Sequence, residues 1–583
     1  MSQAPLSISR RLLGYLAGGG SWRLSAVLVC ILGATVLLAS GPFLIGRIID
    51  EHIVAQRPDG LAQQCLLLLV IYGLAALFGF VQARLMAGIA QGTAGALRRA
   101  LFSHVLQLPP ALFAQRSSGE LISRISLDMD VLAVSLNQGL AQLLSSLVLV
   151  LAALLFMFSL SPWLALLTLA CLSLMFVTTR YLARRARHHV GRQQQTLSLL
   201  TGTLQESIAG LGIIRLFNAH ARFRDGFVQA NQQLCRDASH AQVLAGIVGP
   251  TMNTCNNLGY ALIALAGCWM VWGGFATLGL VAAFLSYSRQ LERPVSEFAN
   301  QFSQIQSAWV GVERAFALLD QPAETDAASA FAAETLAGEL QFDQVQFAYR
   351  PEQPVLRGVS FTVGRGEHVA LAGVTGAGKS TLFNLVLRFI EPTAGRLHLD
   401  GRPLGEFERR ALRRRIGVVL QEPYLFAASV LDNIRYGRPD ASLGQVRHIA
   451  ELLDIDDFIN HLPQGYATVL QAGGQDLSRG QRQLLAIARA LLAEPSLLLL
   501  DEATSNLDRH SERCVRRALA ILMKGRTCLI IAHRLSTVRN ADRILLLDQG
   551  RVIEQGSHAQ LMALDGGYAR LWRAGEDHQD RKF

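Results

Sequence analysis

The segment most informative about the fold is Gly373-Val374-Thr375-Gly376-Ala377-Gly378-Lys379-Ser380. This spacing of glycines, lysine and hydroxyl is typical of a loop that wraps the phosphates of a nucleotide. Glycines let backbone N–H groups turn toward a phosphate, Lys379 can reach its oxygens, and the hydroxyl of Ser380 can bind Mg2+. A buried strand is predicted before the loop, at 367–372, and a helix after it, at 380–387. The sequence therefore predicts an α/β domain that binds ATP or GTP. The predicted contacts in this loop are Gly373, Thr375, Gly376, Ala377, Gly378, Lys379, Ser380 and Thr381.

The first half of the chain has the character of a membrane domain. Hydrophobic residues make up 51% of the 583 residues, which is high for a soluble protein. Four charge-free stretches are long enough to span a bilayer, and the two longest, 131–179 and 238–288, each contain a turn in the middle. We therefore expect six transmembrane helices. Their predicted ranges are 24–46, 60–83, 135–159, 162–182, 243–271 and 276–298.

Arginines mark the side of the membrane on which each connection lies. They are dense before the first span, between the second and third, and between the fourth and fifth. Such an excess is typical of cytoplasmic segments, so both termini are expected in the cytoplasm, with the chain in the cell (inner) membrane. The net charge of +10 follows from this bias and from contact with anionic lipid, so no nucleic-acid partner is needed.

These patterns predict a multidomain chain: an all-α six-helix transmembrane domain with long intracellular helical extensions, then an α/β ATPase domain. The transmembrane domain is expected at 1–318 and a linker at 319–337. The nucleotide-binding domain is expected at 338–575, and a polar tail at 576–583.

Polar residues at predicted strand ends complete the candidate catalytic set. A buried strand at 496–500 leads into Asp501, which would join the Mg2+ shell, and Glu502, which would polarise the attacking water. Gln421 and His533 follow two other predicted strands and are candidates to contact the γ-phosphate. Alone, either would be an ordinary polar residue at a strand end, but their joint order indicates an ATPase. The predicted metal ligands, mostly through water, are Ser380, Gln421 and Asp501.

Residues 338–575 resemble the nucleotide-binding domain of ABC transporters. The segment that carries the resemblance most specifically is Leu477-Ser478-Arg479-Gly480-Gln481. The resemblance implies that Tyr349 stacks on adenine, that Gln421 couples nucleotide to the membrane helices, and that His533 is the switch histidine. It also implies that Ser478, Gly480 and Gln481 contact ATP held by another subunit, so that hydrolysis needs a dimer. Residues 505–508 are similar to the loop that follows the catalytic glutamate in this family.

The membrane half is similar to bacterial exporters with fused membrane and nucleotide domains, of the multidrug or lipid-flippase type. The segments 118–124 and 206–217 resemble their coupling-helix regions. One membrane domain and one nucleotide domain imply a half-transporter that pairs with a second one. Two residues depart from the family pattern: Arg479 replaces a glycine and is expected to point to solvent, and Ala472 replaces a glutamate. Ala472 favours a dissimilar partner over a second copy, while the complete catalytic set is compatible with a homodimer.

A polar stripe in the fifth predicted span is the candidate substrate contact. Asn253, Asn256, Asn257 and Tyr260 recur at helical spacing, and they either line a cavity or bond neighbouring helices. We expect no charge deep in a span, which argues against an ion pathway and favours amphipathic or lipid-like cargo. The predicted function is ATP-driven export or flipping of such a molecule. The alternatives are a siderophore-type importer with the exporter fold, and an ATP-gated channel or regulatory subunit.

Overall fold

The chain forms two compact units. The structure, a computed structural model, describes residues 5–18, 20–115, 118–326, 331, 336–501, 507–531 and 538–580. One unit, here called the membrane unit, comprises residues 1–106 and 118–321. The other, the nucleotide unit, comprises residues 107–117 and 322–583, so it includes a short segment that the sequence placed in the membrane domain.

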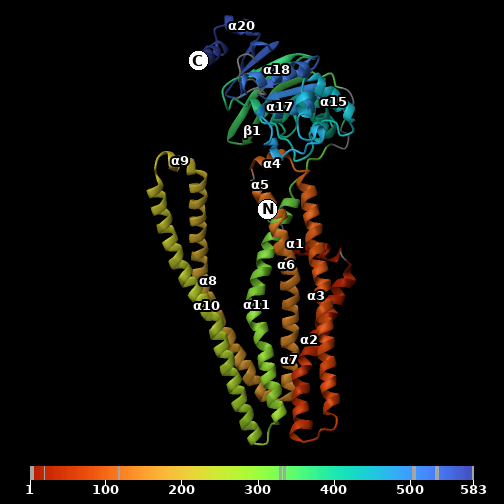
Figure 1. The fold of residues 1–583 in the computed structure, drawn as a ribbon, viewed down its shortest axis with the longest axis vertical. Helices are drawn as coiled ribbons and strands as arrows, with labels where there is room; N and C mark the ends of the chain where they lie inside the picture. Colours follow the sequence, from red (N-terminus) through yellow and green to blue (C-terminus); the bar gives the residue numbers. More distant parts are fainter. Residues whose placement is uncertain are drawn as a thin grey trace. The chain divides into compact units, whose positions relative to one another are not determined.

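The membrane unit is helical, and Figure 1 shows its longest helices, among them α8 and α10 lying side by side with α9 between their ends. Its helices are α1 (Pro5–Ala17), α2 (Ser21–Ile48), α3 (Leu61–Val105), α5 (Ser118–Ile125), α6 (Leu127–Val134), α7 (Ala141–Leu160), α8 (Pro162–Ala209), α9 (Leu211–Leu216), α10 (His220–Trp272) and α11 (Leu278–Leu319). Two π-helical segments, η1 (Ile49–Val54) and η2 (Ser135–Leu140), continue α2 and precede α7. The predicted helical membrane domain, followed by an α/β domain, is confirmed.

Five described helical segments are long and apolar enough to cross a membrane. They are Ser21–Val54, Leu61–Val105, Gly119–Leu160, Pro162–Ala209 and His220–Trp272. The sixth predicted span falls on α11, whose apolar N-terminal part ends at Arg289 and is followed by Glu292 and Arg293. Arg289 therefore lies inside the predicted range 276–298, at the end of its apolar part.

Helix α11 packs against α2 through polar side chains at a proline. Pro42 lies inside α2 and has no N–H to give to the carbonyl of Leu38. The side chain of Gln290 donates to that Leu38 carbonyl at 3.2 Å, and the fully buried Tyr287 hydroxyl donates to the carbonyl of Ala39 at 2.8 Å. Because an unpaired carbonyl is costly in an apolar setting, these contacts favour one arrangement of the two helices.

The same helices meet again at the start of α11. The Asp50 carboxylate accepts hydrogen bonds from the Thr277 hydroxyl and from the backbone N–H of Gly279. A Cβ on Gly279 would lie 1.9 Å from the carbonyl oxygen of Gly46, so only glycine permits this approach of the two backbones.

The nucleotide unit contains two sheets. The four-stranded sheet has the order β2-β1-β4-β5 and the six-stranded sheet β10-β9-β3-β8-β7-β6. Their strands are β1 (Leu340–Arg350), β2 (Gln353–Val363), β3 (His368–Ala372), β4 (Ala394–Leu399), β5 (Arg402–Pro403), β6 (Ile416–Val419), β7 (Leu497–Asp501), β8 (Thr527–Ile531), β9 (Arg543–Asp548) and β10 (Arg551–Gly556). Strands β9, β3, β8, β7 and β6 pair in parallel, and they are built from short, buried apolar runs as expected for a parallel sheet covered on both faces.

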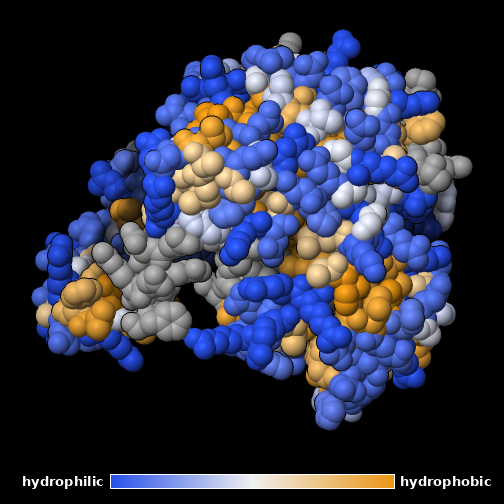
Figure 2. Space-filling view, turned by 90° about the horizontal axis from the view of Figure 1, so that it is seen from above, coloured by the Kyte–Doolittle hydropathy of each residue, from blue (hydrophilic) through white to orange (hydrophobic). Residues whose placement is uncertain are grey.

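Helices surround these sheets. They are α4 (Pro110–Gln115), α12 (Lys379–Val386), α13 (Arg409–Arg415), α14 (Val430–Arg435), α15 (Leu443–Leu452), α16 (Asp456–Asn460), α17 (Arg479–Leu492), α18 (Arg509–Met523), α20 (His558–Ala563) and α21 (Gly567–Asp580), with single turns η3 (Leu404–Glu406), η4 (Gly465–Ala467) and η5 (Ala472–Gly474). Figure 2 shows a face on which hydrophilic side chains dominate and apolar ones form small patches. Helix α21 continues to Asp580, into the predicted polar tail.

Candidate ATP-binding and catalytic site

The predicted phosphate loop connects the end of β3 to the start of α12. Its glycines Gly373, Gly376 and Gly378 have φ angles of +146°, +87° and +103°, a region that favours glycine. A Cβ on Gly373 would also lie 2.2 Å from the carbonyl oxygen of Leu547 in β9. The positive φ angles therefore favour glycine at all three positions. At Gly373 the close approach of β9 also leaves no room for a side chain.

Lys379 places a positive charge within this loop. Its side chain is buried, and its Nζ donates to the carbonyl oxygens of Gly373 at 2.6 Å and Val374 at 3.0 Å. The N-terminus of α12 adds backbone N–H groups at the same place, so the loop favours an anion such as a phosphate. Of the other predicted contacts, Ala377 and Thr381 are buried, and Thr375, Gly376 and Ser380 are exposed.

Tyr349 lies beside the helix that follows the loop. It is near the end of β1 and is half exposed. Its ring makes an edge contact with Phe347, at 4.8 Å between centroids, and its hydroxyl accepts a hydrogen bond from Asn384 of α12 at 3.5 Å. With the phosphates of a nucleotide bound at the N-terminus of α12, a ring beside that helix is in a position to stack on the base.

Asp501 and Gln421 lie at one edge of the six-stranded sheet. Because β3, β8, β7 and β6 are parallel, their carboxyl ends meet at the edge where the phosphate loop leaves β3. Asp501 ends β7, and Gln421 follows β6. The oxygens of Asp501, Gln421 and Ser380 are the hard ligands that Mg2+ prefers, and a bound ion would neutralise charge on the transferred phosphate. Glu502 and His533 lie outside the described residues, as do Ser505 and Asn506, so their roles stay predictions.

The signature segment forms the start of α17. Ser478 is the N-cap residue: its Oγ accepts from the backbone N–H of Gln481 at 3.2 Å, and the Gln481 side chain accepts from the backbone N–H of Ser478 at 2.9 Å. This reciprocal capping orients the first N–H groups of the helix. Gly480 packs on α18, where an added Cβ would lie 2.6 Å from the Cβ of Ser511. Ser511 in turn hydrogen bonds to Asp508, and this contact lowers the pKa of the Asp508 carboxyl.

Two family models match the chain. One, described as the ABC transporter transmembrane region, matches residues 24–295, and one described as ABC transporter matches residues 356–505. An uncharacterised ABC transporter ATP-binding protein of Bacillus subtilis is 38% identical over 566 residues, which cover 97% of this chain and 94% of that protein. The chain belongs to the ABC transporter family.

Other relatives and one solved structure match most of the chain. The fatty acid ABC transporter ATP-binding/permease protein of Mycobacterium tuberculosis is 39% identical over 87% of this transporter and 80% of its own length. An ATP-dependent lipid A-core flippase of Syntrophus aciditrophicus is 34% identical over 97% of this transporter and 94% of its own length. A bacterial Atm1-family ABC exporter with ATP bound matches with a TM-score of 0.77 and 29% identity, covering 95% of this chain and 98% of that one.

The predicted resemblance to bacterial half-transporters of the exporter type is thereby confirmed. This membrane-spanning ABC transporter binds ATP and is an ATPase coupled to transport. Exporters of this half-transporter form generally act as dimers.

The transporter's two departures from the family pattern differ in their surroundings. The side chain of Arg479 is partly exposed, at 27%, and its guanidinium lies 3.7 Å from a carboxylate oxygen of the exposed Glu422, the residue after Gln421. The expectation that Arg479 points to solvent stays a prediction. Ala472 begins η5 and is exposed, and its effect on coupling stays a prediction.

One residue of this site was missed in the sequence. Gln483 of α17 is 1% exposed, and its side chain donates to the carbonyl of Leu420 at 3.1 Å. The signature helix therefore contacts both neighbours of Gln421, through Gln483 on one side and Arg479 on the other. A lone glutamine among the apolar residues Leu484, Leu485 and Ile487 was the available signal.

The polar stripe of the membrane unit lies on α10. Asn253 and Asn257 are exposed, whereas Asn256 and Tyr260 are half buried. The guanidinium of Arg289, from α11, lies 4.8 Å from the centroid of the Tyr260 ring. A cation on an aromatic face inside a predicted span marks a candidate functional position that the sequence analysis did not include.

Proposed function

We propose that this transporter uses ATP to move an anionic, lipid-like amphiphile across the membrane in the export direction, working as a dimer in the cell membrane with both termini cytoplasmic. The observation that carries the proposal is Arg289 over Tyr260, next to the asparagines of α10. A charge within a span is costly unless it has a partner, and an acidic headgroup supplies one. The names of two relatives, a fatty acid transporter and a lipid A-core flippase, support the same class of cargo.

In the proposed cycle each ATP is held by the phosphate loop of one subunit and the signature segment of the other. Lys379 neutralises the β- and γ-phosphates, and Tyr349 stacks on the adenine. The N-terminus of α17, ordered by Ser478 and Gln481, faces the γ-phosphate across the dimer. Closure of the two nucleotide units favours the outward-facing state of the membrane helices, and hydrolysis assisted by Glu502 resets them.

Lipid movement in proteoliposomes tests this function. The probes are fluorescent phosphatidylglycerol, which is anionic, and fluorescent phosphatidylcholine, which is zwitterionic, and dithionite quenching reports the leaflet of each. We expect ATP to move phosphatidylglycerol away from the leaflet on the side of the nucleotide units, and Glu502→Gln to abolish the movement. Arg289→Gln should slow phosphatidylglycerol more than phosphatidylcholine while leaving basal ATP hydrolysis unchanged, and Arg289→Lys should retain part of the preference.

Two results would contradict the proposal. Movement toward the nucleotide units would indicate an importer. Steady ATP hydrolysis without ATP-dependent movement of either lipid would reject lipid-like cargo and favour a regulatory subunit.

A further inference from the structure

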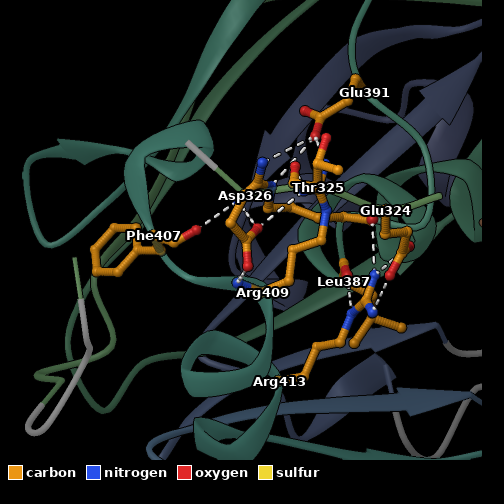
Figure 3. Close-up of polar contacts among 9 residues, drawn as sticks. Glu324, Thr325, Asp326, Leu387, Glu391, Phe407, Arg409 and Arg413 are labelled. Carbon is orange, nitrogen blue, oxygen red and sulfur yellow. Dashed lines mark hydrogen bonds and ion pairs between the residues drawn. The ribbon is translucent and has the colours of Figure 1, made fainter. Parts of the chain in front are cut away.

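The segment that follows α11, at the start of the second part of the nucleotide unit, makes an ion-pair network within that unit. This network, the linker cluster, comprises the carboxylates of Glu324, Asp326 and Glu391 and the guanidinium groups of Arg388, Arg409 and Arg413. Figure 3 shows the labelled side chains converging from the linker, from the segment after α12 and from α13. The three negative charges of the cluster balance its three positive charges.

Arg413 joins the linker to the helix that begins at the phosphate loop. Its guanidinium binds the Glu324 carboxylate through two hydrogen bonds, of 2.7 and 2.8 Å. The same group donates to the carbonyl oxygens of Leu387 at 3.0 Å and Arg388 at 2.9 Å, at the C-terminal end of α12. Because α12 begins at Lys379, one short helix separates the predicted phosphate site from the Glu324–Arg413 pair.

A second acidic residue of the linker, Asp326, is bound by Arg409. Arg409 binds Asp326 through its backbone N–H at 3.1 Å and its guanidinium at 2.9 Å, and it also contacts Glu391 at 2.9 Å. Arg388, 6% exposed, pairs with Glu391 and donates to the carbonyl of Phe407. Both acidic residues of the linker are therefore fixed to α13.

Glu324 has a second contact, to the chain that leaves α3. Its backbone N–H donates to the carbonyl of Gln107 at 2.9 Å. Gln107 lies two residues after the end of α3, and Glu324 lies five residues after the end of α11. Two long helices of the membrane unit therefore continue, through short covalent connections, to residues that meet at Glu324.

We propose that Glu324 and Arg413 are positioning residues that couple the nucleotide state of the phosphate loop to α3 and α11. A shift of α12 on nucleotide binding would move the carbonyls that Arg413 holds, and with them Glu324 and Gln107. The guanidinium and the carboxylate are only 28% and 17% exposed, so solvent screens this pair less than an open surface pair. Such a role rests on the family's transport ATPase and does not depend on the identity of the cargo.

The test is hydrogen–deuterium exchange of the full-length transporter in nanodiscs, with and without ATP and vanadate, on wild type and Glu324→Gln. Peptides over 373–386 report nucleotide at the loop, and peptides over 49–60 and 273–279 report the connections of the membrane helices. We expect Glu324→Gln to keep the protection at 373–386 and the KM for ATP. The nucleotide-dependent change at 49–60 and 273–279 should fall at least about fivefold, the lower end of typical coupling between two sites.

A matched control removes a similar pair elsewhere in the same unit. Arg543 binds Glu367 through hydrogen bonds of 2.8 and 3.0 Å with 27% and 24% exposure, between β9 and the turn before β3. Glu367→Gln should preserve the distant change. If it causes the same loss as Glu324→Gln, or if Glu324→Gln retains the wild-type change, the proposal is overturned.

A charge exchange separates coupling from simple anchoring. In the double variant Glu324→Arg and Arg413→Glu the ion pair can form again, but a carboxylate at 413 cannot donate to the carbonyls of Leu387 and Arg388. We expect the exchange to recover thermal stability without recovering the distant change. Recovery of both would show that the pair only anchors the linker.

Discussion

At the scale of single residues, Tyr349 gives the most direct test of the nucleotide site. Its half-exposed ring is held by Phe347 and Asn384 in a position beside α12. Aromatic stacking contributes roughly 0.5–1.5 kcal/mol, so Tyr349→Ala should raise the KM for ATP about two- to tenfold. The measurement is steady-state hydrolysis at varied ATP concentration. Tyr349→Phe, which keeps the ring and loses only the long hydrogen bond to Asn384, should change KM little. An equal loss in both variants would assign the hydroxyl, and not the ring, to binding.

At the scale of elements, the contact between α17 and α18 aligns the signature segment. Gly480→Ala would put a methyl group 2.6 Å from the Cβ of Ser511, and the two helices would have to move apart. Overpacking of this kind typically costs about 1–3 kcal/mol, and it would also displace the capped N-terminus of α17. We expect lower thermal stability together with an ATPase rate reduced at least about tenfold, since the same N–H groups are proposed to meet the γ-phosphate.

Gly405→Ala serves as the control for this substitution. That glycine lies in η3 of the same unit, with open space around an added Cβ, and its φ angle is not positive. It should alter neither stability nor rate. Normal hydrolysis in Gly480→Ala would contradict the alignment role of the α17–α18 contact.

At the scale of the whole molecule, one chain supplies one phosphate loop and one signature segment, so two chains are needed for two complete sites. When hydrolysis is blocked, ATP should stay bound between the two subunits and stabilise the dimer. We expect Glu502→Gln with ATP and Mg2+ to increase the dimeric fraction of this chain expressed alone, measured as particle mass in detergent. Lys379→Ala, which removes the ammonium group from the phosphate loop, should abolish the increase. Monomers under all conditions would indicate that a different half-transporter completes the sites, as Ala472 suggests.

Local patterns in the sequence were enough to predict the two-part organisation, five of the apolar spans, the phosphate loop and the signature segment. These features depend on local order: glycine spacing around Lys379, apolar runs of membrane length, and a hydroxyl residue three positions before a glutamine at Ser478 and Gln481. Each of these patterns lies within a short run of consecutive residues, because the backbone conformation that it specifies depends only on neighbours in the chain.

Contacts between distant side chains became visible only in the folded chain. Arg413 reaches Glu324 across 89 positions of the chain, and Tyr287 reaches the carbonyl of Ala39 across 248. The sequence left 319–337 as a linker and missed Arg289, because the partner of a charge depends on which elements the fold packs together and not on its neighbours in the chain. A charged group that must leave water needs a partner from another element, and packing alone determines where that partner lies.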